Sequence, residues 1–132
     1  MRAATPALIL ALIAPPALAE DPPPRTTQDG VYTSKQAERG KEGYKQSCAG
    51  CHPLDWYRGG VMKSWDGAPL ANLLDALSTT MPQDNPGSLK RREYLDLLAY
   101  ILSLNDMPTG SVELPVPAED LRKIVVKWRS KP

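Results

Sequence analysis

The first segment with a helical pattern follows a helix start signal at Thr33. Residues 33–36 (Thr-Ser-Lys-Gln) match a capping box, in which the Thr33 hydroxyl accepts a hydrogen bond from the backbone N–H of Gln36. The side chain of Gln36 is expected to reach back to Thr33 in return. The pattern predicts a helix that ends at about Ser47.

Two further segments carry one apolar face each. One begins near Pro69, which suits the first turn of a helix because the N–H that proline lacks would be unpaired there. Its apolar residues stand at i, i+3, i+4 and i+7: Leu70, Leu73, Leu74 and Leu77. The other runs from about Leu89 to Leu104. Its apolar stripe consists of Tyr94, Leu97, Leu98, Ile101 and Leu102. No alternating strand pattern precedes residue 120, so we predict an all-α fold with three main helices and long loops.

Composition narrows the class of protein. A chain of 132 residues with 42% hydrophobic and 23% charged residues is typical of one small globular domain. A formal charge of +1 gives no electrostatic footprint for nucleic acid. No apolar run approaches the roughly 20 residues that span a bilayer. The chain has no Phe, so aromatic side chains to fill a core are scarce.

The N-terminal pattern is typical of a secretory signal peptide. Arg2 provides a positive charge, residues 7–14 are apolar, and residues 17–19 (Ala-Leu-Ala) form a small-x-small cleavage site. We therefore predict that residues 1–19 are removed after Ala19 and that the protein is exported to the periplasm. Residues 20–31 are rich in proline and polar residues and are expected to form a flexible lead-in.

The chemistry is concentrated in residues 48–52, Cys-Ala-Gly-Cys-His. This spacing is the attachment signature of c-type haem, because two thiols three positions apart can form thioethers with one porphyrin edge. The adjacent His52 is then placed to ligate the iron. A thioredoxin-like dithiol would need a βαβ context, and a plain disulfide would not need the histidine. We therefore predict one haem c, held covalently by Cys48 and Cys51.

The sixth ligand of the iron cannot be a second histidine, because His52 is the only one in the chain. The methionines that remain after signal cleavage are Met62, Met81 and Met107. Met81 is the best placed of these, in a proline-stiffened loop between the second and third helices. Met62, Met107 and an open sixth position remain as alternatives.

Four stretches together resemble the class I cytochromes c, in particular bacterial periplasmic forms with one haem. These are QAxRGxxxYxxxCAGCH (residues 36–52), WDGAPLxxLLxxL (65–77), TMPxxxPGxL (80–89) and YLDLLAYILSLNDMPTG (94–110). The resemblance covers residues 32–110 and implies a small cytochrome c fold wrapped around the haem. It places the axial methionine of the family on Met81.

The resemblance also implies a crossing of the first and last main helices. There Gly40 or Gly43, with Tyr44, would meet Leu97 and Tyr100. Lys90 stands where the family usually has a Ser or Thr cap before the last helix, three residues ahead of a Glu, which moves the expected cap to Ser88.

Several aromatic and basic residues lie near enough in the sequence to reach the haem edge or its propionates. Their aromatic or guanidinium groups suit such contacts. The candidates are Trp56, Tyr57, Arg58 and Trp65, together with Pro82 beside Met81.

These features predict a one-electron, outer-sphere carrier rather than an enzyme. Its partners would be a dehydrogenase or another donor and an acceptor such as an oxidase. Two alternatives remain: a tightly bound haem subunit of a larger periplasmic dehydrogenase, and a haem enzyme or gas-binding protein with an open sixth position. The chain is expected to be a monomer or one subunit of a redox complex.

Residues 111–132 form an extension beyond the resemblance. Residues 113–117 (ELPVP) should be extended, because residues before proline avoid the helical region. Residues 121–128 have helical spacing but a β-branched run at 124–126, so we expect at most one helical turn followed by extended chain. Trp128 is expected to fold back onto the domain. The alternative is a strap that docks on the partner through its basic residues: Arg122, Lys123, Lys127, Arg129 and Lys131.

Overall fold

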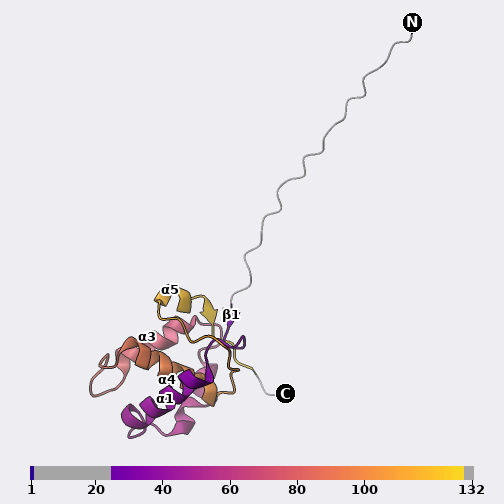
Figure 1. Ribbon diagram of the computed structural model, residues 1–132. Helices are drawn as coiled ribbons and strands as arrows, with labels where there is room; N and C mark the ends of the chain where they lie inside the picture. The colour runs from indigo at the N-terminus through magenta and orange to yellow at the C-terminus, as the bar shows by residue number, and fades with distance from the viewer. Residues whose placement is uncertain (2–24, 130–132) are drawn as a thin grey trace.

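The computed structural model describes Met1 and residues 25–129 (Figure 1). The predicted signal peptide and its cleavage site lie outside the described residues, Met1 apart. Three main helices form the fold: α1 (Ser34–Ser47), α3 (Leu70–Thr80) and α4 (Arg91–Leu104). The remaining elements are short. They are η1 (Leu54–Tyr57), α2 (Gly60–Lys63), α5 (Ala118–Leu121), β1 (Arg25–Thr26) and β2 (Ile124–Val125). The predicted small all-α architecture is confirmed, with one tiny strand pair added.

Helix α1 begins as the sequence predicts, but its cap differs in one respect. The Thr33 hydroxyl accepts a hydrogen bond from the Gln36 N–H at 3.1 Å. The Gln36 side chain does not return to Thr33, however. Its Oε1 accepts a hydrogen bond of 2.9 Å from the backbone N–H of Leu114, and the residue is buried. The Gln36 side chain, which a capping box would bond to Thr33, therefore bonds to the C-terminal extension instead. This hydrogen bond couples the start of α1 to a residue 78 positions away in the sequence.

Helix α4 begins two residues later than predicted. Its N-cap is Lys90, whose backbone N–H donates to the Glu93 carboxylate at 2.6 Å. The cap expected at Ser88 is therefore wrong. A carboxylate in the first turn satisfies a free N–H and also suits the positive end of the helix dipole.

Helices α1 and α4 pack against each other at a glycine. A Cβ atom built on Gly40 would lie 1.8 Å from the backbone oxygen of Asp96 and 2.8 Å from Cβ of Tyr100. At Gly43 the same construction meets only Leu97 Cδ2, at an ordinary 3.5 Å. The resemblance left two candidates for the contact, and Gly40 is the one at which the backbones approach closely.

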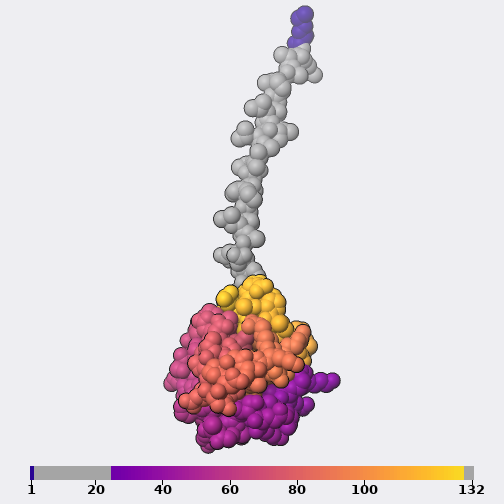
Figure 2. All heavy atoms as spheres, turned by 90° about the vertical axis from the view of Figure 1, so that its left-hand side faces the viewer, coloured from indigo at the N-terminus to yellow at the C-terminus, as the bar shows by residue number. Residues whose placement is uncertain are grey.

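The extension after residue 110 belongs to the folded domain. It forms one helical turn, α5, and then the short strand β2, as its sequence predicts. Four of its apolar side chains are buried in the core: Leu114, Leu121, Ile124 and Val126. Trp128 packs against the core and is half-buried. Figure 2 shows the end of the described chain, in yellow, gathered at one end of the domain.

Residues 25–31 also pack on the domain, where the sequence predicted a flexible lead-in. Strand β1 pairs in parallel with β2, with Arg25 opposite Ile124 (Figure 1). Thr27 is fully buried. The extended tail provides the partner strand, which the composition of residues 20–31 could not reveal.

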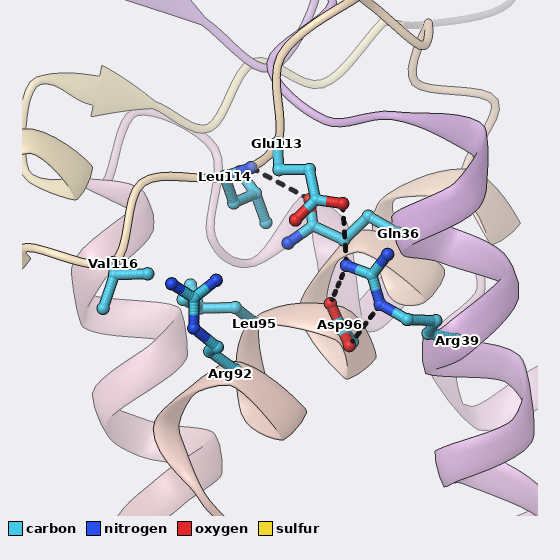
Figure 3. Close-up of a pocket in the computed structure, with 8 residues that line it drawn as sticks. All are labelled: Gln36, Arg39, Arg92, Leu95, Asp96, Glu113, Leu114 and Val116. Atoms are coloured by element: carbon cyan, nitrogen blue, oxygen red, sulfur yellow. Dashed lines mark hydrogen bonds and ion pairs between the residues drawn. The ribbon is translucent and has the colours of Figure 1, made fainter.

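Two ion pairs also join the C-terminal extension to helices α1 and α4. The Arg39 guanidinium donates to the Asp96 carboxylate at 2.9 Å and to the Glu113 carboxylate at 2.8 Å (Figure 3). Half of the Arg39 side chain is exposed, so these ion pairs contribute little energy individually. They orient the segment that leads from Glu113 to the buried Leu114.

Within the described residues, none of the helices combines the length and the apolar character that a membrane span requires.

Candidate functional site

The Cys-x-x-Cys-His motif forms one tight turn directly after α1. Cys48 is the C-cap of the helix, and its carbonyl accepts hydrogen bonds from the N–H groups of Cys51 at 3.1 Å and His52 at 2.9 Å. In the described residues no disulfide joins Cys48 to Cys51. Cys48 and His52 are half-buried, and Cys51 is exposed. The turn thus offers two thiols and an imidazole from five consecutive positions.

This turn borders two cavities that share three lining residues: His52, Tyr57 and Met81. The larger has a volume of about 440 Å³ and is also lined by Cys48 and Cys51. The smaller has a volume of about 210 Å³. Its other lining residues are mostly apolar: Trp56, Val61, Met62, Trp65, Leu73, Ala76, Leu77, Thr80 and Ile101. Two thiols, an imidazole and a thioether therefore line the larger cavity, and this is the donor set that a covalently bound haem uses.

Met81 is held at the end of α3 from two sides. It is the C-cap of that helix, and its N–H donates to the Leu77 carbonyl at 3.0 Å. The Tyr94 hydroxyl of α4 donates to the Met81 carbonyl at 2.7 Å. The backbone of Met81 is therefore anchored to both helices, while its side chain lines both cavities.

The other two methionine candidates lie in different surroundings. Met107 is buried, and its sulfur lies 2.8 Å from the Gln28 amide nitrogen, while its carbonyl accepts from the Tyr32 hydroxyl at 2.6 Å. It lines neither cavity. Met62 is fully buried and lines only the smaller cavity. Met81 is thus the one of the three that lines both cavities.

Aromatic residues surround His52. The Tyr44 hydroxyl donates a short hydrogen bond to the His52 carbonyl. The imidazole lies with its centroid 5.6 Å from the ring of Trp56 and 5.8 Å from that of Tyr57. Asn105, at the end of α4, donates to the Tyr57 carbonyl at 2.7 Å. The turn that carries both aromatic rings is therefore tied to α4.

Burial also controls the titration of groups beside the motif. Burial raises the pKa of Tyr57 to about 12, and the neighbouring Cys48 and Tyr44 add to the effect. Burial likewise raises the pKa of the Cys48 thiol. Tyr57 therefore stays neutral at physiological pH and adds no charge to the cavity.

The comparison with families of known proteins decides the identity. The model of the family described as cytochrome c oxidase, cbb3-type, subunit III matches residues 35–101. The chain belongs to this family of c-type cytochromes. It binds haem c covalently and transfers electrons through it. Searches of curated proteins and of solved structures found no match.

The cytochrome brings four of the five predicted haem-edge residues to the cavities, and Trp56 is one of those that line the smaller cavity. Tyr57 lines both, Pro82 lines the larger, and Trp65 lines the smaller. Arg58 lines neither and is exposed, with its guanidinium 3.6 Å from the Asp55 carboxylate.

The sequence does not reveal the residues whose hydrogen bonds anchor the backbone of the ligand-bearing segments. The sequence pattern places Tyr94 only on the apolar stripe of its helix and does not single out Asn105. Their roles depend on the carbonyl groups of Met81 and Tyr57, which are distant in the sequence. The sequence offers no local signal for such contacts, apart from a polar tip on an otherwise apolar helix face in the case of Tyr94.

Proposed function

We propose that this cytochrome is a periplasmic one-electron carrier whose single haem c is attached to Cys48 and Cys51 and ligated by His52 and Met81. The observation that supports it is the shared lining of the two cavities. Both thiols, the imidazole and Met81 line the larger cavity, and His52 and Met81 also line the smaller, mostly apolar one. The proposed donor is a periplasmic dehydrogenase or a similar enzyme, and the proposed acceptor is a terminal oxidase or its equivalent.

The residues of the chain position the ligand-bearing segments and limit the access of water to the haem site. When bound, haem supplies the one-electron Fe(III)/Fe(II) couple, and a thioether ligand raises its potential relative to imidazole. Tyr44 and Asn105 hold the His52 side of the hollow, and Tyr94 holds the backbone of Met81. Anchoring both ligand-bearing segments limits the rearrangement that accompanies a change of charge. The apolar lining excludes water from the site.

The Met81→Ala variant tests the ligand assignment. The variant should lose the low-spin His/Met spectrum and have a lower midpoint potential, because a weaker ligand or water would replace the thioether. Haem should stay covalently attached, since Cys48 and Cys51 are unchanged. Absorption spectroscopy and redox titration of the purified holoprotein measure both effects.

Met107→Ala is the matched control for this experiment. It truncates a buried methionine outside the two cavities, so we expect lower stability with an unchanged spectrum. If Met107→Ala or Met62→Ala abolished the low-spin spectrum and Met81→Ala did not, the assignment would be wrong. Ready CO binding by the unaltered protein would instead favour an enzyme or gas-binding protein with an open sixth position.

A second candidate function is that of a tightly bound haem subunit. The family description, which names a subunit of an oxidase, favours it. Gel filtration of native periplasmic and membrane extracts, followed at the haem absorption band, separates the two. A freely diffusing carrier should elute as a species no larger than the 14.4 kDa of the full chain, because signal cleavage is expected to remove residues 1–19. Co-elution with a much larger complex at high salt would favour the subunit, since transient redox contacts bury less than about 1,200 Å² and dissociate readily.

A further inference from the structure

The C-terminal residues 124–128 form the middle of a three-segment layer, with residues 25–28 along one edge. Beyond the β1–β2 pairing, Thr27 N–H donates to the Val125 carbonyl at 3.0 Å. The Thr27 hydroxyl accepts from Lys127 N–H at 3.0 Å, and Thr27 is fully buried. We call residues 124–128 the C-terminal clamp.

The other edge of the clamp holds the turn at residues 66–69. Gly67 N–H donates to the Val126 carbonyl at 2.9 Å, and Val126 N–H donates to the Ala68 carbonyl at 2.8 Å. The Asp66 carboxylate accepts a bond of 2.6 Å from Trp128 N–H. Three hydrogen bonds thus fasten a turn that has Gly67 at a positive φ of 83°.

This turn directly follows a residue in the wall of the smaller cavity. Trp65 immediately precedes the turn, and its side chain lines the smaller cavity. Met62 lines the same cavity, and its carbonyl accepts a hydrogen bond of 3.1 Å from the Trp65 N–H. Helix α3 follows the turn and ends at Thr80, with Met81 as its C-cap. The clamp therefore fastens the connection between one wall residue, Trp65, and the helix that ends at the proposed ligand.

The contacts of the clamp go beyond surface attachment. Val126 is fully buried and Ile124 is 3% exposed. Backbone hydrogen bonds on both edges, together with this apolar burial, keep the turn from moving outward independently. Lys127, one of the basic residues expected to form a docking strap, is exposed on the same segment.

We propose that the C-terminal clamp is a positioning element of the haem site, which holds the Trp65 wall closed beside Met81. The proposal rests on the proposed function, because it assumes that Met81 ligates the iron. The apolar shell of a metal site controls the access of solvent and the local dielectric, and through them the redox potential. A loosened wall should therefore admit water and external ligands and lower the midpoint potential.

The experiment uses ferric holoprotein and imidazole as the external ligand. A variant truncated after Lys123 loses the clamp but keeps α5. At temperatures well below its melting transition, we expect imidazole to displace Met81 at least tenfold faster than in the full-length protein, together with a lower midpoint potential. Stopped-flow absorption and redox titration measure these quantities.

Two controls separate positioning from stability. Truncation after Arg129 removes only residues outside the described range and should leave both quantities unchanged. Leu114→Ala destabilises the tail at the α1–α4 side, away from the two haem cavities. It should lower the melting temperature without changing the imidazole rate. A Lys123 truncation that lowers only the melting temperature, as Leu114→Ala does, would overturn the proposal.

A second pair of variants applies if the truncated chain does not fold. Asp66→Ala removes the acceptor of the Trp128 N–H bond, whereas Asp66→Asn keeps an oxygen in its place. We expect a severalfold faster imidazole reaction for Asp66→Ala and a nearly unchanged rate for Asp66→Asn. Equal, unchanged rates for both would contradict the clamp. A failed ligand assignment is distinguishable, because it would show in Met81→Ala of the full-length protein.

Discussion

Replacing Gly40 with alanine is expected to destabilise the domain by about 3 kcal/mol or more. The added Cβ would lie 1.8 Å from the Asp96 carbonyl oxygen and 2.5 Å from its carbon, and both are backbone atoms of α4. A side chain could rotate away, but a helix backbone cannot, so α1 and α4 would have to separate. This pair carries the Cys-x-x-Cys-His turn at one end and Tyr94 on the other helix, so the haem site depends on it.

Gly43→Ala is the matched control, three residues along the same helix. Its Cβ would meet only Leu97 Cδ2, at 3.5 Å. Because alanine is the better helix former, we expect a stability between unchanged and about 1 kcal/mol higher. Thermal unfolding of the two holoproteins measures the difference, which should separate their melting temperatures by roughly 12 °C or more. Similar melting temperatures for the two variants would show that the contact at Gly40 relaxes at little cost.

Replacing both Cys48 and Cys51 with alanine is expected to leave a largely unfolded chain. The two cavities, of about 440 and 210 Å³, are bordered by side chains that would face water without a covalently attached haem. Small domains have little stability to spare, commonly 5–15 kcal/mol in total. Far-UV circular dichroism at 25 °C should show the loss of most of the helical signal and a broad, weakly cooperative thermal transition.

Met81→Ala serves as the comparison for this variant. It alters the same cavities but retains both thiols, so it should keep haem and most of its helical signal. A double cysteine variant with a native-like spectrum and a sharp transition would contradict the idea that haem completes the core. It would mean that the protein contacts, such as those of α1 with α4, suffice to fold the chain.

Local patterns in the sequence predicted the three main helices well. The apolar face of α3 and the capping signal at Thr33 are set by neighbours within a few residues, so they can be read without a tertiary structure. The structure differs from the sequence prediction at two helix starts, Gln36 and Lys90, where another hydrogen-bond partner decides the geometry. Lys90 N–H donates to the Glu93 carboxylate. For Gln36 the competing partner is Leu114 N–H, 78 residues away.

By itself the sequence determined the helices, the haem attachment turn and the single helical turn of the tail, because each depends on spacing within one short segment. The tertiary structure decided at which glycine the backbones of α1 and α4 approach closely and which methionine lines both cavities. It also decided that the Tyr94 hydroxyl donates to the Met81 carbonyl. It also showed that residues 25–28 and 124–128 share one layer beside the Trp65 turn. These features join segments that are distant in the chain, and their energies arise only when the packed core brings the partners within hydrogen-bond or van der Waals distance.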